Sequence, residues 1–343
     1  MEPSSPLLDI RDLTVSFGDG RFQAVKGVDF QLFSGEVVGL VGESGSGKSL
    51  TAFSLMGLLP HGARLDRGAM IFQGQDLVAL DRRTRRELCG RRMGMVFQEP
   101  LTALNPVLTI GEQTAEIFRL RDGRSAKEAR RLAVELLGQV GLPNPERAAE
   151  SYPHRFSGGM RQRVVIAMAL ALKPALVIAD EPTTALDPTI AAQIVRLLKN
   201  MAAERRATVL FITHNLKLLA GLARRVMVMY AGRLVEQTGA DFADPLHPYA
   251  QGLLKAIPPD PADRSVTRLA PIPGQPSSLA DDRPGCPFEP RCPERRDRCA
   301  RELPPMFELP DGRLVRCFQR APQGDGQAAL RPAAQADVPP CSG

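Results

Sequence analysis

The 343-residue sequence lacks several features that would assign it to familiar classes of protein. No stretch reaches the roughly 18 consecutive apolar residues that a membrane-spanning helix needs. Residues 1–5 have neither a basic cluster nor an apolar run, so we expect no secretory signal peptide. No block of about five or six like charges marks a basic tail. We therefore expect a protein that stays on the side of the membrane where it was made, and any spanning segments that it serves would belong to a partner.

What the sequence does contain is typical of a folded protein of about two domains. Hydrophobic residues make up 43% and charged residues 24% of the chain, which is ordinary for globular proteins. The formal net charge of +6 is spread over many arginines. This distribution favours an Arg-rich solvated surface, with binding to nucleic acid or anionic lipid as the alternative.

Apolar segments of strand length alternate with helical segments. The expected strands are 13–17, 37–41, 93–97, 176–179 and 208–213, and the expected helices are 50–59, 126–140 and 160–172. Such alternation implies an α/β fold with a mostly parallel sheet. Near residue 241 prolines begin to break regular structure, and the tail 321–343, rich in Ala, Pro, Gln and Gly, is expected to be disordered.

A glycine-rich segment lies between an expected strand and an expected helix. Residues 42–49 read Gly-Glu-Ser-Gly-Ser-Gly-Lys-Ser and fit the pattern G-x-x-x-x-G-K-[ST]. The glycines let backbone N–H groups close around phosphate oxygens, and the helix that follows adds its positive dipole end. Lys48 would reach the β- and γ-phosphates, and the Ser49 hydroxyl would bind Mg²⁺. The segment predicts ATP binding, with an ordinary glycine turn as the alternative.

Two carboxylates end the apolar run 176–179. Asp180 is expected at the carboxyl end of a parallel strand, where ligands bind, and is a candidate Mg²⁺ ligand. Glu181 follows it and could face the attacking water. An Asp-Glu pair before Pro182 can also be a turn or a helix start, but the phosphate loop favours the functional interpretation.

A second candidate phosphate site is the segment 156–162, which reads Phe-Ser-Gly-Gly-Met-Arg-Gln. Ser157 and the backbone N–H groups at the start of the next helix form a potential anion site. Taken singly, Ser157 could be a helix cap and nothing more. Because the chain already has one phosphate loop, a second phosphate-binding helix start needs a partner.

Together these segments resemble the ordered motifs of ATP-binding-cassette ATPases over about residues 7–240. The motifs are the Walker A loop, Q-loop, signature, Walker B motif, D-loop and switch histidine. Their residues here are Gly42, Ser44, Gly45, Gly47, Lys48 and Ser49, then Gln98, then Ser157, Gly158, Gly159 and Gln162, then Asp180 and Glu181, then Ala185, Leu186 and Asp187, and finally His214. Phe17 stands where the family has an aromatic residue, often Tyr, that stacks on adenine, and stacking needs only the ring face.

The resemblance implies that two cassettes dimerise head to tail, so that each ATP lies between one subunit's loop and the other's signature segment and Asp187. Glu181 would polarise the water as general base. Gln98 would touch Mg²⁺ and the water and would couple to the membrane partner. His214 would contact the γ-phosphate, although a lone histidine after a strand is often a satisfied loop residue.

The implied fold is an α/β P-loop NTPase with a mixed sheet, a helical subdomain and a small Cys-containing C-terminal extension. Residues 7–98 and 157–240 would form the RecA-like ATPase core, and residues 99–156 the helical subdomain. Residues 241–320 would form an extension of the oligopeptide-transporter type, followed by the tail 321–343.

The resemblance is closer than the superfamily. Residues 94–106 look like the Q-loop of dipeptide and oligopeptide importers, and residues 247–249 resemble the start of their C-terminal extension. Segments 45–47, 56–60 and 183–187 resemble the D-type ATPase subunit. We therefore expect a heterodimer with a different F-type chain, two transmembrane permeases and an extracytoplasmic solute-binding protein, at the cytoplasmic face of the cell membrane. Near relatives import nickel or other small solutes, and the cassette residues do not choose among them.

Six cysteines are present, and four fall within one Pro-rich segment: Cys286, Cys292, Cys299 and Cys317. Their separations of 5, 6 and 17 residues match neither a zinc ribbon nor a bacterial ferredoxin run. Four thiols with little core around them still favour a soft metal centre over a disulfide. Related importers resemble this segment and can carry a [4Fe–4S] cluster there; zinc and free structural thiols are the alternatives. We expect no chemical role for Cys89 or Cys341.

Three functions therefore compete. The first is an ATP-hydrolysing, energy-coupling importer subunit, in which ATP closes the dimer and hydrolysis resets it. The second is a soluble cassette ATPase acting on nucleic acid or the ribosome, but such proteins usually carry tandem cassettes or long arms, and this chain has one phosphate loop. The third is a non-hydrolysing regulatory cassette, which the presence of Glu181 and His214 disfavours. The first is the interpretation that we carry forward, with no nucleic-acid partner.

Overall fold

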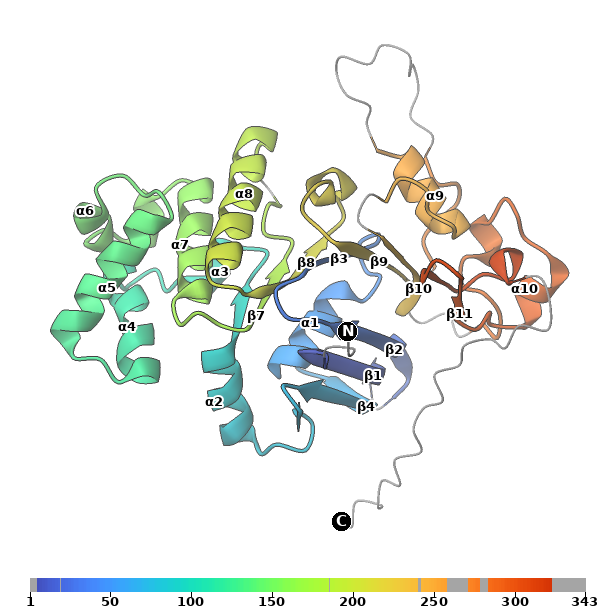
Figure 1. The fold of residues 1–343 in the computed structure, drawn as a ribbon, viewed down its shortest axis with the longest axis horizontal. Coiled ribbons are helices and arrows are strands. Elements are labelled where there is room, and N and C mark those ends of the chain that lie inside the picture. Colours follow the sequence, from blue (N-terminus) through green and yellow to red (C-terminus); the bar gives the residue numbers. More distant parts are fainter. Residues whose placement is uncertain are drawn as a thin grey trace.

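The computed structural model describes residues 5–18, 20–184, 186–239, 242–257, 271–277 and 283–322. Two β-sheets form its framework, with helices on both sides of the larger one (Figure 1). Most of the tail for which disorder is expected, residues 323–343, lies outside the described residues, as do Cys341 and Ala185 of the D-loop segment.

The smaller sheet is antiparallel and contains the N-terminal strands in the order β2-β1-β4-β5. Its strands are β1 (Leu8–Phe17), β2 (Phe22–Leu32), β4 (Ala63–Phe72) and β5 (Gln75–Asp76). Side chains such as Leu8, Leu13 and Phe72 are fully buried against the larger sheet's strands and helix α1 (Lys48–Met56). This packing holds β1 against helix α1, which begins at the end of the glycine-rich loop.

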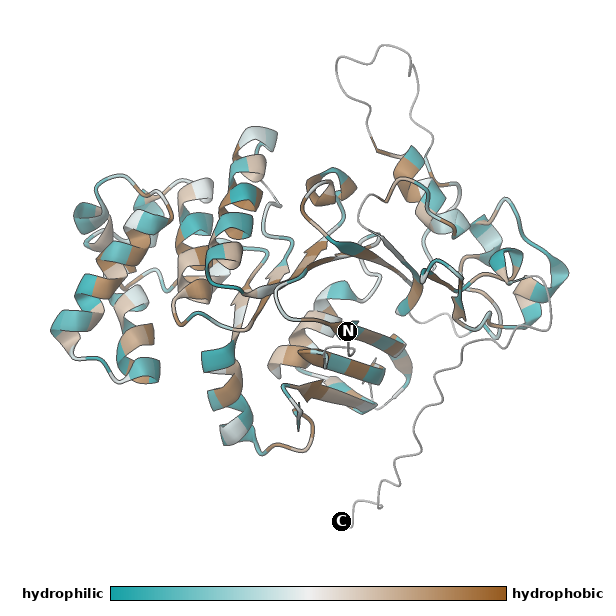
Figure 2. Cartoon of the chain, viewed as in Figure 1, coloured by the Kyte–Doolittle hydropathy of each residue, from teal (hydrophilic) through white to brown (hydrophobic). Residues whose placement is uncertain are grey.

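The larger sheet has the order β11-β12-β10-β9-β3-β8-β7-β6. Its five strands from β9 to β6 are parallel and its other three are antiparallel, so the expected mixed α/β sheet is confirmed. Their bounds are β3 (Val37–Val41), β6 (Met93–Val96), β7 (Leu176–Asp180), β8 (Thr208–Thr213), β9 (Arg225–Tyr230), β10 (Arg233–Gly239), β11 (Phe307–Glu308) and β12 (Leu314–Val315). Every residue of β7 and β8 is buried, and Figure 2 shows these central strands as hydrophobic, as expected for strands covered on both faces.

Helices surround this sheet and form a separate group at one end (Figure 1). That group contains α4 (Ile110–Asp122), α5 (Ala126–Gln139) and α6 (Pro145–Ala149), whereas the short α3 (Pro100–Ala103) lies against α7 (Gly158–Leu170). The others are α2 (Arg82–Arg92), α8 (Pro188–Glu204), α9 (Pro248–Lys255) and α10 (Asp297–Arg301). Among the described residues no helix combines the length and apolar character needed to cross a membrane.

Two of the helices begin two residues before the sequence pattern suggested. The apolar periodicity marks starts at residues 50 and 160, whereas α1 begins at Lys48 and α7 at Gly158. The reason is that the capping residues Gly47 and Ser157 set the first turn, and the polar or glycine residues after them carry no apolar signal.

The C-terminal extension is joined to the core sheet. Strand β12 pairs with β10, with Val315 opposite Glu236 and Leu314 opposite Gln237. The sheet therefore runs across the boundary that we expect near residue 240, and the division into domains remains a prediction. The two parts also share an aromatic cluster of Tyr230, Tyr249 and Phe288, whose ring centroids lie 4.5–5.4 Å apart.

Candidate active site

The glycine-rich loop connects β3 to α1, as the motif requires. Gly47 has φ of 104°, a conformation that favours glycine. A Cβ on Gly47 would also lie 2.8 Å from the Ala24 carbonyl oxygen. A Cβ on Gly42 would lie 2.2 Å from the Met229 carbonyl oxygen. The neighbouring chain therefore requires glycine at both positions, and the loop is held close to strand β9.

The lysine of the loop folds back over it. Lys48 is 5% exposed, and its Nζ donates hydrogen bonds at 2.9 Å to the carbonyl oxygens of Gly42 and of Glu43. Burial lowers the pKa of Lys48, and the carboxylates of Glu181, Asp180 and Glu43 oppose that shift. A phosphate group arriving here would add further negative charge beside the ammonium group. Ser44 and Gly45 are exposed at the tip of the loop.

A hydroxyl and a carboxylate meet beside the loop. The Ser49 hydroxyl, in the first turn of α1, donates to Asp180 Oδ1 at 3.0 Å, and Asp180 ends β7 with 2% of its surface exposed. Burial raises the pKa of Asp180, and the hydrogen bond from Ser49 opposes this. Two hard oxygen ligands at this spacing fit Mg²⁺, which binds through one or two protein ligands and completes its shell with water and phosphate.

Glu181 occupies a strained backbone position at the same edge of the sheet. Its φ is 44°, which a non-glycine residue adopts only when its surroundings hold it. One carboxylate oxygen, Oε2, meets three groups: Thr184 Oγ1 at 2.8 Å, His214 Nδ1 at 3.1 Å and Gln98 Nε2 at 3.5 Å. The three expected catalytic residues, distant in sequence, thus lie together.

The residue expected to stack on adenine, Phe17, is paired with a second ring. Phe17 stacks on Phe22 with a centroid distance of 5.3 Å and an interplanar angle of 12°. Phe22 begins β2, directly across the turn from Phe17 at the end of β1. Sequence reasoning identified Phe17 alone. Phe22, its register partner across the turn, was a usable signal for the second ring.

The second helix start lies on a different part of the surface. Ser157 caps α7 by accepting a hydrogen bond from the Met160 N–H at 3.3 Å, and Ser157 and Gly158 are both exposed. Asp187 is likewise exposed and caps α8. Gln162 differs, because it is 1% exposed and its Nε2 has no hydrogen-bond partner among the described residues. The trans contacts of this group remain predictions.

Sequence reasoning missed two kinds of contact. Thr184 was not assigned a role, although its position three residues after Glu181 in a turn was a usable signal. Glu43 was also given no role, yet Arg291 and Tyr249 of the C-terminal extension form hydrogen bonds with it. Nothing in the local sequence connects residues so far apart.

The four clustered cysteines lie near one another but do not form a metal-binding group. The backbones of two of them meet, because the Cys286 N–H donates to the Cys299 carbonyl oxygen at 2.7 Å. Burial raises the pKa of Cys286 to about 12 and that of Cys292 to about 11. Within the described residues no three or more His, Cys, Asp or Glu side chains are arranged to hold a metal ion. This arrangement does not support the expected iron–sulfur cluster, and all four thiols are free of disulfides.

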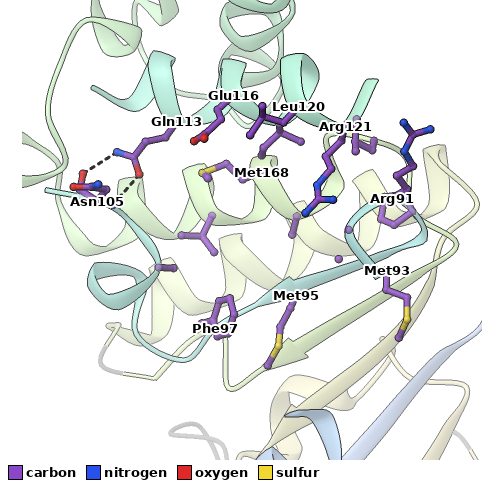
Figure 3. Close-up of a pocket in the computed structure, with 18 of the residues that line it drawn as sticks. Arg91, Met93, Met95, Phe97, Asn105, Gln113, Glu116, Leu120, Arg121 and Met168 are labelled. Carbon is purple, nitrogen blue, oxygen red and sulfur yellow. Dashed lines mark hydrogen bonds between the residues drawn. The ribbon is translucent and has the colours of Figure 1, made fainter. Parts of the chain in front are cut away.

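A groove of about 470 Å³ separates the helical group from the core sheet (Figure 3). Its floor is apolar and includes Met93, Met95 and Phe97 from β6 and the segment after it, while α4 supplies Glu116 and Leu120 on the opposite wall. Leu120 is 70% exposed. Phe97, which lines the groove, directly precedes Gln98 in the sequence, and Gln98 contacts Glu181.

Comparison with known proteins agrees with this geometry. Residues 25–184 match the family model described as ABC transporter, and residues 235–299 match the model described as oligopeptide/dipeptide transporter, C-terminal region.

Whole-chain relatives are also similar. The oligopeptide transport ATP-binding protein OppD of Salmonella typhimurium is 45% identical, covering 93% of this chain and 95% of its own. The dipeptide transport ATP-binding protein DppD of Escherichia coli is 45% identical, covering 91% and 96%. A solved dimeric ATP-binding cassette in a post-hydrolysis state, bound to ADP and Pi, is 30% identical with a TM-score of 0.61, covering 68% of this chain and 98% of that one.

Proposed function

Because this chain belongs to the ABC transporter family of ATPases, we propose that it is the energy-coupling subunit of an importer for dipeptides or oligopeptides. The relatives' names and the match of residues 235–299 to a peptide-transporter region support the solute class. The observation that carries the enzymatic part is the convergence of Gln98, Thr184 and His214 on Glu181, beside the Ser49–Asp180 pair.

ATP hydrolysis follows from the roles of these side chains. Lys48 and the loop amides would hold the β- and γ-phosphates, and Ser49 and Asp180 would hold Mg²⁺, whose chemistry is to offset charge on the phosphates. Glu181 accepts the proton of the attacking water. The contacts of Gln98, Thr184 and His214 with Glu181 all fall on Oε2, so we assign to Oε1 the role of accepting the proton from water. His214 and Thr184 keep the carboxylate in place, and Phe17 with Phe22 offers ring faces to adenine.

The exposed start of α7 supports a dimer in which it completes a partner's site. Ser157 and Gly158 present an open helix N-terminus, which attracts anions, while Gly159 and Asp187 flank it. We propose a partner of the F type, so that the pair is a heterodimer. Gln162 would act from beneath this surface, by orienting the first turn of α7, since its side chain is buried.

The groove beside α4 is our candidate docking surface for a transmembrane permease. It is apolar at its floor, and its rim carries exposed Leu120 and charged Arg121. An element that enters it would press on the segment leading to Gln98 and so reach Glu181. Such docking would hold the chain at the cytoplasmic face of the cell membrane, with an extracytoplasmic solute-binding protein on the other side.

Two experiments test this function. Purified with its permeases and its second ATPase chain, the protein should hydrolyse ATP only with Mg²⁺, and the rate should rise when the cognate binding protein delivers peptide. Stimulation by nickel or another small solute in place of peptide would redirect the solute assignment. Salt-sensitive binding to nucleic acid, without association with permeases, would favour the soluble-ATPase alternative.

We further propose that the Cys286–Cys317 segment takes up a soft metal when the cell supplies one, either as a [4Fe–4S] cluster or as zinc. What supports this is that four cysteines fall within one segment, in which Cys286 and Cys299 share a backbone hydrogen bond of 2.7 Å, since thiolates are soft ligands. Binding would require the thiols to rearrange from the described positions. Anaerobic purification followed by iron, sulfide and zinc assays distinguishes the two. Metal-free protein that folds and functions would leave the thiols as structural.

A further inference from the structure

The phosphate loop is held from behind by the C-terminal extension. The guanidinium of Arg291 donates to both carboxylate oxygens of Glu43, at 2.7 Å to Oε2 and 3.0 Å to Oε1. The hydroxyl of Tyr249 accepts a hydrogen bond from the Glu43 N–H at 2.7 Å. Both the side chain and the backbone of the second residue of the loop are therefore fixed by residues more than 200 positions away.

Arg291 is itself held firmly. Its side chain is 4% exposed, and its Nε donates to the Pro273 carbonyl oxygen at 2.9 Å. The guanidinium lies over the rings of Tyr230 and Phe288, 5.8 Å from each centroid. A planar guanidinium that is stacked, buried and doubly bonded to a carboxylate has little freedom to turn. Any movement of Arg291 must therefore involve Glu43.

Glu43 is in turn joined to the lysine that binds phosphate. Lys48 Nζ donates to the Glu43 carbonyl oxygen at 2.9 Å, and the Ser46 N–H donates to the same oxygen at 3.2 Å. A displacement of residue 43 thus shifts the anchor of Lys48 and the curvature of the amides that would surround phosphate. A chain of direct contacts runs from Arg291 through Glu43 to Lys48.

The other end of this chain lies within the cysteine segment. Arg291 ends the short turn Glu289–Arg291, directly before Cys292, whose N–H donates to the Glu289 carbonyl oxygen at 3.1 Å. The Cys286 N–H donates to the Cys299 carbonyl oxygen at 2.7 Å, which closes the segment on itself. The fold of the cysteine segment therefore decides where the guanidinium stands.

We propose that Arg291 is a positioning residue for ATP binding: by clamping Glu43 it sets the shape of the phosphate loop and makes nucleotide affinity depend on the folded state of the cysteine segment. This rests on the proposed ATPase function of the loop and adds a route by which the extension regulates it. The extension is then more than a covering of the core sheet.

The test measures ATP affinity of the full-length chain by nucleotide titration, with KM and kcat from the assembled complex. Arg291→Met, which keeps an unbranched chain over the rings, and Glu43→Gln should each weaken ATP binding about tenfold, because each removes a charge-assisted bond pair. The ATP affinity of the double variant should be no lower than that of the single variant that binds ATP less tightly. KM should rise while kcat at saturating ATP changes less than about twofold, since the hydrolytic residues are untouched. Arg291→Lys should recover part of the affinity.

The matched control is Arg295→Met, in the same segment but 63% exposed and near Glu289; it should bind ATP as the wild type does. Glu43→Gln guards against an Arg291 variant that fails to fold, because Glu43 is partly exposed and the amide keeps its size. Unchanged affinity in folded Arg291→Met and Glu43→Gln would overturn the proposal, as would losses that multiply in the double variant. In either case the wild-type protein still hydrolyses ATP. A wild-type protein without ATPase activity would instead contradict the proposed function, so the two failures can be distinguished.

Discussion

Two helix N-termini in this molecule have similar backbone chemistry and opposite surroundings. Helix α1 begins after Gly47 with a buried lysine, whose Nζ is bonded to its own loop, and with Ser49 bonded to Asp180. Helix α7 begins after Ser157 with an exposed glycine. Both present free N–H groups that attract anions. The difference teaches that a helix start can bind nucleotide on its own chain only where that chain adds a cation and metal ligands; in the proposed dimer, the start of α7 completes a partner's site instead.

The largest effect should come from Glu181→Gln. In this variant, bound ATP should keep the start of α1 and the partner's start of α7 together, because the ATP is not hydrolysed. The amide cannot accept the proton from water, so turnover should fall about a thousandfold, while ATP binding is retained. Size-exclusion chromatography with ATP should show a stable dimer of the chain with its partner. Turnover within about twofold of the wild type would contradict the assignment of the base. Glu204→Gln, at the far end of α8, is the control.

Next in size is Lys48→Ala, which removes the cation from the start of α1. ATP affinity should fall about a hundredfold, because charge-assisted bonds to phosphate are lost in a buried site. A fluorescence titration with a labelled nucleotide measures this on the single chain. Lys199→Ala, on the exposed face of α8, should bind normally. If Lys48→Ala bound ATP as tightly as the wild type, the two helix starts would no longer differ in the way described.

Gly158→Asp alters the start of α7. A carboxylate at the first position of α7 would repel the partner's γ-phosphate, so turnover of the complex should fall about thirtyfold. ATP binding to the single chain should not change, since this start lies outside its own site. Ala126→Asp is the matched control, because Ala126 is the exposed first residue of α5 and Ser125 caps that helix in the same way. Loss of ATP binding by the isolated Gly158→Asp chain would show that both starts serve one site.

Much of this architecture is readable from the sequence, and the limits have physical reasons. The strands 37–41 and 208–213 match β3 and β8 residue for residue, because strands buried on both faces are continuous apolar runs. The loop residues and Asp180 follow from motif spacing along the chain. The grip of Arg291 on Glu43 could not be predicted, since it depends on a tertiary fold that brings a Pro-rich segment behind the loop. The burial of Gln162 was missed for the same reason.

The smallest effect that sharpens the comparison is on stability, through Asp180. Burial raises the pKa of Asp180, so the ionised carboxylate costs stability at neutral pH in the protein without Mg²⁺. Because the folded-state pKa is the higher of the two, this cost is absent below the unfolded-state pKa, grows as pH rises from that value to the folded-state pKa, and is constant above it. Asp180→Asn should therefore raise the unfolding midpoint by about 2 °C at pH 7.

Calorimetry at two pH values checks the Asp180→Asn prediction, because the gain should vanish below about pH 3, where the wild-type carboxyl is largely protonated in both states. Asp81→Asn is the control of opposite sign: hydrogen bonds from Thr84 lower the pKa of this exposed cap of α2, so its loss should not raise the midpoint. A lower midpoint for Asp180→Asn at pH 7 would mean that Ser49 and Lys48 stabilise the carboxylate more than burial destabilises it. The ionised Asp180 at the start of α1 would then not destabilise the protein without Mg²⁺. In that case the starts of α1 and α7 would differ in their exposure to solvent but not in the cost of a buried charge.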